Sequence, residues 1–176
     1  MQENSITYQW TGTTYGNGWM HKWLVRILRW TDVRIIYAFT AVFIVPVCLV
    51  LNKSRSIIYR YFRQRQGYGV WRSVWHTFVN HFLFSQIVID RFAMYAGKKF
   101  NVEMEGYDHF LQLAKQEPGF IQLSSHIGNY EIAGYTLVAE YKPFNALVYY
   151  GEKESVMHGR EQMFSDTNIK IIPGRN

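Results

Sequence analysis

The chain has 176 residues, carries a formal net charge of +6 at pH 7, and is 48% apolar and 18% aromatic. This length is typical of one domain, and the single cysteine, Cys48, rules out an intrachain disulfide framework. Because neither paired cysteines nor a His-Glu-x-x-His pattern occurs, the sequence predicts no metal site.

The charge is divided unevenly along the chain. Residues 1–100 hold 13 Lys/Arg and 3 Asp/Glu, whereas residues 101–176 hold 6 Lys/Arg and 10 Asp/Glu. Such asymmetry predicts that the first hundred residues meet an anionic partner, either nucleic acid or a membrane with phosphorylated lipids. No nucleic-acid motif accompanies the basic residues, and an apolar run lies among them, so we favour an anionic membrane surface over nucleic acid.

Helical patterns dominate the first hundred residues. After about twenty residues that read as irregular, the spacing of apolar residues predicts helices over 22–30, 54–66 and 70–96, with a break at 67–69. Arg60, Arg63 and Arg65 lie on the second of these helices. Such a basic run forms either a solvated helix face or, beside a membrane anchor, a site for lipid headgroups.

The seventeen residues from Ile35 to Leu51 contain no charge. This length is the short limit for a membrane-spanning helix, and Pro46 interrupts the run. Because basic residues flank both ends, the positive-inside rule gives no orientation. We expect a membrane anchor that either spans the bilayer or lies in one leaflet. The alternative is a helix buried in the core of the protein.

The pattern changes after Gly97. Alternating or short apolar runs predict strands over 100–104, 120–123, 144–150 and 168–172, and helical spacing predicts helices over 107–116, 129–141 and 152–164. Strands that alternate with helices predict an α/β fold with a mainly parallel sheet and flanking helices. The expected organisation is a helical membrane-associated region over 1–97, with its anchor at 35–51, followed by a partial α/β domain over 98–176.

The sequence Ser-Ser-His-Ile-Gly-Asn-Tyr-Glu over residues 124–131, here called the candidate block, lies where the predicted strand 120–123 turns into the predicted helix 129–141. A separation of five residues is about 500° in an ideal helix, so His126 and Glu131 meet only if His126 precedes the helix. A carboxylate that holds one imidazole nitrogen as N–H leaves the other free to take a proton from a substrate hydroxyl. The candidate block therefore predicts a general base at the end of a strand, where ligands usually bind in open α/β sheets.

The candidate block has a second interpretation in which it serves only the fold. In that interpretation His126 caps the helix, and Glu131 interacts favourably with the helix dipole. The flanking residues favour function, because Gly128 permits close approach to the backbone and Ser125 and Asn129 add polar groups. A serine nucleophile is not expected, since no Gly-x-Ser-x-Gly turn occurs.

The segment Leu-Ser-Ser-His-Ile-Gly-Asn-Tyr-Glu-Ile-Ala-Gly, residues 123–134, resembles the catalytic block of the lipid A biosynthesis (lauroyl/myristoyl) acyltransferases. These enzymes are members of the His-x4-Asp/Glu lysophospholipid acyltransferase superfamily, and general similarity extends upstream to residue 10. The resemblance implies that His126 is the general base and that Glu131 orients it. It further implies that Ser125, Gly128 and Asn129 bind substrate.

The same resemblance implies the substrates and the location. The acceptor is expected to be a hydroxyl of a lipid A precursor or a related glycolipid. The donor is expected to be a fatty acyl thioester, by resemblance that of acyl carrier protein, with no further cofactor. The expected location is the bacterial inner membrane, with the catalytic part on the cytoplasmic side.

Members of the resembled family are longer than 176 residues, so the resemblance implies an amino-terminal fragment or a truncated gene product. We expect such a fragment to leave its sheet unfinished and to lack acyl transfer activity by itself. The alternative interpretation is a non-catalytic, membrane-associated fragment that binds lipid.

Overall fold

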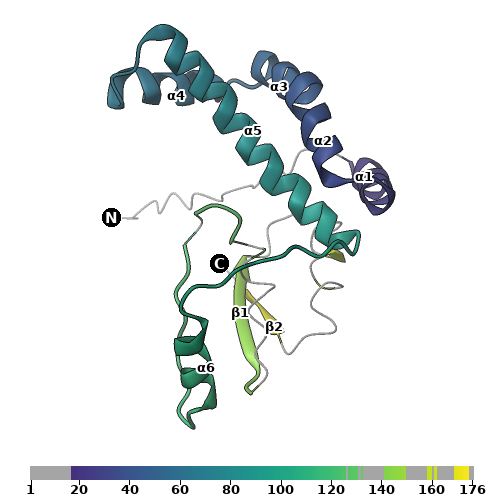
Figure 1. Cartoon of the computed structure of the whole chain (residues 1–176), viewed down its shortest axis with the longest axis vertical. Coiled ribbons are helices and arrows are strands. Elements are labelled where there is room, and N and C mark those ends of the chain that lie inside the picture. Colours follow the sequence, from purple (N-terminus) through teal and green to yellow (C-terminus); the bar gives the residue numbers. More distant parts are fainter. Residues whose placement is uncertain are drawn as a thin grey trace, which may run out of the picture. The chain divides into compact units, whose positions relative to one another are not determined.

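The computed structural model describes residues 17–125, 127–130, 132, 141–149, 158–159, 161 and 169–174. The described part is mostly helical and contains one pair of parallel strands (Figure 1). The chain separates into two compact units. Residues 22–103 and 122–136 form the first, here called the helical unit, and residues 1–21, 104–121 and 137–176 form the second, here called the strand unit. The candidate block therefore groups with the helices, and the predicted domains 1–97 and 98–176 stay a prediction.

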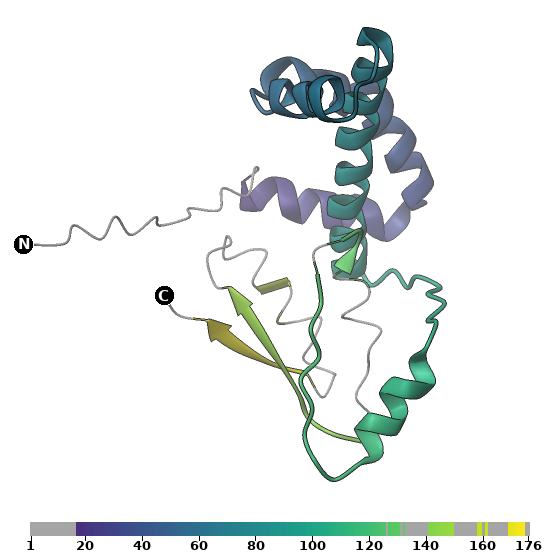
Figure 2. The ribbon, with the colours of Figure 1, turned by 90° about the vertical axis from the view of Figure 1, so that its left-hand side faces the viewer.

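One long helix organises the helical unit. The helical elements between residues 17 and 96 are, in chain order, α1 (Gly18–Trp30, of which residues 18–21 group with the strand unit), α2 (Val33–Phe39), the π-helical segment η1 (Thr40–Ile44), α3 (Val45–Leu51), α4 (Arg55–Arg60), the π-helical segment η2 (Tyr61–Arg65) and α5 (Val70–Tyr95). Both α2 and α3 lie along α5, and α4 contacts α5 as well (Figure 1, Figure 2). The predicted helices over 22–30, 54–66 and 70–96 are confirmed to within four residues at each end. Residues 18–20, predicted to be irregular, belong to α1.

The segments α2, η1 and α3 form one continuous helix over Val33–Leu51, here called the apolar helix. Asp32 begins it by accepting a hydrogen bond from the Arg34 backbone N–H at 2.8 Å. Pro46 has no N–H, and in a regular α-helix its ring would clash with the carbonyl of Val42. The turn before Pro46 is instead π-helical, which accommodates the proline without ending the helix. The helix predicted over 35–51 is confirmed.

Arg55 caps the carboxyl end of the apolar helix. Its Nη1 donates hydrogen bonds to the carbonyl oxygens of Leu49 and, at 2.9 Å, Val50. These carbonyls lie in the last turn, where the helix itself supplies no N–H donors. The guanidinium also compensates the negative end of the helix dipole. Arg55, one of the basic residues that flank the apolar run, therefore stabilises the end of the helix.

The side chains buried on the apolar helix and on the first half of α5 are small. They are Thr40 and Val45 on the apolar helix and Ser73 and Thr77 on α5. Thr77 Oγ1 donates to the Ser73 carbonyl at 2.7 Å, and Ser73 Oγ donates to the Tyr68 carbonyl at 3.4 Å. Small residues with internally satisfied hydroxyls let two helices approach closely, as they do in membrane proteins.

A glycine cap ends α5. The Lys98 N–H donates to the Ala93 carbonyl and the Gly97 N–H donates to the Met94 carbonyl, each at 2.9 Å. Gly97 has a φ of 87°, the left-handed conformation that this cap requires and that glycine adopts without strain. The last turns before the cap supply much of the buried core of the helical unit, from Ile89, Phe92, Ala93 and Met94.

An aromatic cluster holds the turn between η2 and α5. The rings of Phe62 and Tyr68 stack with centroids 5.9 Å apart, and His76 of α5 lies 4.9 Å from the Tyr68 ring. Gly67, with a φ of 67°, reverses the chain there. The break predicted at this turn is confirmed. His76 is half-buried in the cluster.

The described elements of the strand unit are α6 (Tyr107–Lys115), β1 (Phe144–Tyr149) and β2 (Ile169–Gly174). The two strands are parallel, with Phe144 opposite Ile169. These elements confirm the predicted helix over 107–116 and the predicted strands over 144–150 and 168–172, each to within two residues. Parallel pairing agrees with the predicted sheet type, but the described sheet has only two strands.

Lys142 holds the chain that leaves α6. Its Nζ donates to three successive carbonyl oxygens, those of Gln116, Glu117 at 3.3 Å and Pro118 at 2.8 Å. A cation at the carboxyl end of a helix is favourable because it compensates the helix dipole. Phe110, in the first turn of α6, meets the Phe120 ring edge to face at 5.8 Å.

Two predicted strands are wrong. Residues 100–104 and 120–123 have no strand structure, and Ile121 and Leu123 are 88% and 90% exposed. A strand needs a neighbour to satisfy its backbone groups, and among the described residues β1 and β2 pair only with each other. Of the helix predicted over 129–141, residues 130 and 132 are helical and Tyr141 is not. Of the helix predicted over 152–164, residues 158, 159 and 161 are helical. The remaining positions of these two helices lie outside the described residues, apart from Asn129, which caps the first.

Candidate functional site

The candidate block begins as exposed, irregular chain and then turns into a helix. Gly128 adopts a left-handed φ of 63°, and Tyr130 and Ile132 are helical. Asn129 Oδ1 accepts a hydrogen bond from the Ile132 backbone N–H at 3.4 Å. This is the geometry of a helix N-cap, in which the side chain satisfies a donor that the first turn leaves free. The predicted helix start within the block is confirmed, although the strand before it is not.

The predicted site residues are only partly within the described structure. His126 and Glu131, the predicted general base and its partner, lie outside the described residues. Ser125 and Gly128 are exposed, and Asn129 is half-buried. Their predicted roles in catalysis and substrate binding stay predictions, and the described geometry concerns the chain that surrounds them.

Asp90 of α5 connects the candidate block to the apolar helix. Its Oδ2 accepts a hydrogen bond from Asn129 Nδ2 at 3.0 Å, and its Oδ1 accepts one from the Tyr37 hydroxyl. All three residues belong to the helical unit. The orientation of the Asn129 amide follows from the chemistry, because an ionised carboxylate only accepts and so must face the NH₂ group. One carboxylate thus receives donors from two segments, one in the apolar helix and one in the block.

Asp90 was not among the residues predicted from the sequence, although a pattern marks it. Between residues 17 and 102 the chain has two acidic residues, Asp32 and Asp90, in a segment with 13 basic ones. Asp32 begins the apolar helix. An acid near the carboxyl end of a long aromatic and apolar helix has no such local explanation, which makes a distant partner the natural expectation.

The apolar helix is exposed rather than buried. It is long and apolar enough to cross a membrane, and 11% of its most apolar window is buried in the structure. A core helix of a soluble protein is mostly buried, so the interpretation as a core helix is disfavoured. No other helix within the described residues meets the same criteria of length and composition. The exposed apolar side chains on it are Ile35, Phe39, Val42, Phe43, Ile44, Val47, Val50 and Leu51.

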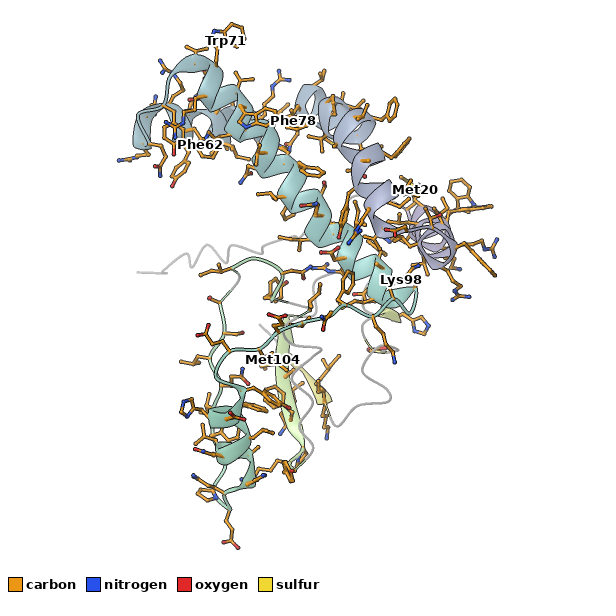
Figure 3. All side chains as sticks on the ribbon, in the orientation of Figure 1. Met20, Phe62, Trp71, Phe78, Lys98 and Met104 are labelled. Atoms are coloured by element: carbon orange, nitrogen blue, oxygen red, sulfur yellow. The ribbon has the colours of Figure 1, made fainter. Side chains whose placement is uncertain are left out.

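A second exposed apolar stripe follows α5. Trp71, Val74 and Trp75 are exposed at helical spacing, and Phe78 continues the stripe by stacking on Trp75 at 5.7 Å. Figure 3 shows Trp71 pointing away from the neighbouring helices at the beginning of α5. Contiguous exposed apolar surface of this kind marks a site of contact with a protein or a membrane.

His81 of α5 contacts the backbone of its own helix. His81 Nδ1 lies 2.8 Å from the Thr77 carbonyl, and its buried Nε2 has no hydrogen-bond partner in the described structure. Among the residues that the structure describes, no group of three or more His, Cys, Asp or Glu side chains is placed to hold a metal ion.

Comparison with known proteins adds no assignment: no family model, no curated protein and no solved structure matches this chain. The candidate function therefore rests on the residues of the block and on the structural context described above.

Proposed function

We propose that the chain belongs to a membrane-associated acyltransferase that moves a fatty acyl group from a thioester to a hydroxyl of a glycolipid, such as a lipid A precursor. The resemblance of residues 123–134 to the catalytic block of such enzymes carries the choice of reaction. In this proposal the sheet is part of a mainly parallel α/β domain, and the anchor holds the enzyme at the cytoplasmic face of the bacterial inner membrane.

The structural observation that best supports the proposal is the grouping of the candidate block with the helical unit, which contains the apolar helix. Residues 122–136 belong to the helical unit, and Asn129 is tied through Asp90 to Tyr37 of the apolar helix. An enzyme that acts on a lipid headgroup needs its reacting groups near the bilayer surface. The described contacts join the block to the helix that is most suited to enter the bilayer.

The proposed chemistry is one direct displacement. His126 takes the proton from the acceptor hydroxyl as the oxygen attacks the thioester carbonyl carbon, and the C–S bond breaks to release the thiol of acyl carrier protein. The thiolate that leaves takes up the proton that His126 received. Glu131 keeps His126 in the tautomer that can accept the proton and stabilises the imidazolium that forms. Ser125 and Gly128, both exposed, are the proposed contacts to substrate.

The experiment uses the product of the complete reading frame in vesicles that contain a lipid A precursor, with acyl carrier protein thioester as donor. His126→Ala should lower kcat about 10²–10⁴-fold, the usual contribution of a general base. Glu131→Gln should also lower kcat, because it loosens His126 and removes a compensating charge. Vesicle binding should stay unchanged in both variants.

Matched controls are present in the strand unit. His109→Ala and Glu105→Gln change exposed side chains of the same types and should leave the rate of transfer unchanged. Near wild-type transfer by His126→Ala would contradict the proposal. Absence of transfer by the wild-type protein, together with retained binding of the lipid, would favour the non-catalytic interpretation.

A further inference from the structure

Asp90 contacts two distant segments of the chain. It is a half-buried carboxylate on a long helix, and each of its two oxygens accepts a hydrogen bond from a segment far away in the sequence. One donor is Tyr37, 53 residues earlier, and the other is Asn129, 39 residues later. Hydrogen bonds to a charged acceptor are the stronger kind, and they fix the direction of both donors.

The hydrogen bonds continue from Asp90 into the candidate block. Asn129 receives its orientation from the carboxylate through Nδ2 and uses its Oδ1 to cap Ile132. Gly128, with its left-handed φ, lies immediately before this capped turn. Rotation of the Asn129 side chain would therefore change both the cap and the start of the helix on which the block ends.

We propose that Asp90 is a positioning residue for the candidate block. Its carboxylate fixes Asn129, and through Asn129 the turn between His126 and Glu131, relative to the apolar helix. This inference rests on the proposed function, since it assigns the purpose of the contact to the acyl transfer reaction. Asp90 does not itself touch substrate in this scheme.

Exchange of the two side-chain types provides a sharp test. Asn129→Asp places a second carboxylate against Asp90, so the contact becomes repulsive and no donor faces Oδ2. Adding Asp90→Asn restores an amide–carboxylate pair with reversed roles. In this double variant the amide at position 90 donates to the carboxylate at position 129 and accepts from Tyr37, while that carboxylate still accepts from the Ile132 N–H. Asp90→Asn alone should have a mild effect, because the Tyr37 hydroxyl is able to turn and accept instead.

The readouts are steady-state kinetics on vesicles and amide hydrogen exchange at Ile132 in the product of the complete reading frame. Asn129→Asp should lower kcat by roughly 10–100-fold, the range expected when reacting groups are displaced by about 1 Å, with little change in KM for the lipid. Exchange at the Ile132 N–H should accelerate in the same variant. The double variant should recover kcat to within about threefold of wild type and restore the slow exchange.

Each outcome decides the proposal. If the double variant stays as impaired as Asn129→Asp, Asp90 has no positioning role. The same holds if Asn129→Asp has wild-type kcat while His126→Ala is inactive. In both cases the proposed function still stands. If His126→Ala is fully active, the proposed function fails first. Asp90→Leu, which removes both acceptors, is the complementary variant, and its vesicle binding and melting temperature separate a local effect from general unfolding.

Discussion

The two compact units differ in charge and in the surface they present. By sequence, the helical unit contains 13 Lys/Arg and 4 Asp/Glu, whereas the strand unit contains 6 Lys/Arg and 9 Asp/Glu. The helical unit also holds the exposed apolar helix and the aromatic stripe of α5. Positive charge, exposed aromatic rings and an apolar helix in one unit are the combination expected at an anionic membrane surface.

The division into two units also places the candidate block with the helical unit. Although residues 122–136 follow α6 of the strand unit in the chain, they group with the helices. Chain order alone would have placed them with the sheet. The block is therefore better understood as an extension of the helical unit than as the edge of a strand layer.

The largest expected effect comes from charges on the apolar helix. Val42→Asp combined with Val47→Asp changes two exposed apolar positions near its middle. Each acidic residue at the centre of a membrane helix costs about 3 kcal/mol, so flotation of the protein with vesicles should be lost at both low and high salt. Leu147→Asp, at an exposed apolar position on β1, should float like the wild type. Unchanged flotation of the double variant would show that the apolar helix has no role in membrane binding.

The basic residues of the helical unit should contribute less to vesicle binding than the apolar helix does. Arg60→Gln combined with Arg65→Gln removes two exposed charges that no described hydrogen bond engages. At about 1 kcal/mol for each charge near an anionic surface, the two should weaken binding to vesicles rich in anionic lipid by roughly 30-fold. The loss should vanish at high ionic strength and on neutral vesicles. Lys170→Gln in the strand unit is the control, and an equal loss per charge there would erase the contrast between the units.

Substitutions that strain the backbone at Gly128 should have a smaller effect, which is measured as a loss of stability at the turn of the candidate block. Its φ of 63° disfavours residues with a Cβ, although among the described residues no atom beyond its chain neighbours lies within 4 Å of where that Cβ would be. Gly128→Ala should therefore destabilise the helical unit by about 1–2 kcal/mol through backbone strain alone. Gly128→Asn should cost clearly less, because asparagine tolerates this conformation. Gly119→Ala is the control, and equal melting temperatures for all variants would show that the turn is not as described.

The smallest expected effect tests the strand unit on its own. Lys142→Met removes the three hydrogen bonds to the carbonyls after α6 and should cost about 0.3–1 kcal/mol of stability. Vesicle binding should not change, since Lys142 belongs to the unit without the apolar helix. Thermal unfolding and flotation measured together check both parts. A loss of flotation would mean that the two units do not act separately in membrane binding.

Strong local patterns were sufficient to predict the helices. The glycines at residues 67 and 97 separate elements, and the apolar residues of α5 follow a helical period; the structure agrees with both signals. Pro46, in contrast, does not interrupt the apolar helix. The short apolar runs at 100–104 and 120–123 were misread, because a strand depends on a neighbouring strand that no local pattern reveals. Asp90 escaped prediction for the same reason, since its partners Tyr37 and Asn129 are set by tertiary packing.

In the proposed function, the candidate block works at the surface of the membrane. A photoreactive diazirine amino acid at position 127, where Ile127 is 82% exposed beside His126, tests this directly in vesicles that contain a lipid A precursor. We expect light-dependent adducts between position 127 and lipid, suppressed in the Val42→Asp/Val47→Asp background. If vesicle-bound protein forms no lipid adduct at position 127, the candidate block does not work at the membrane surface.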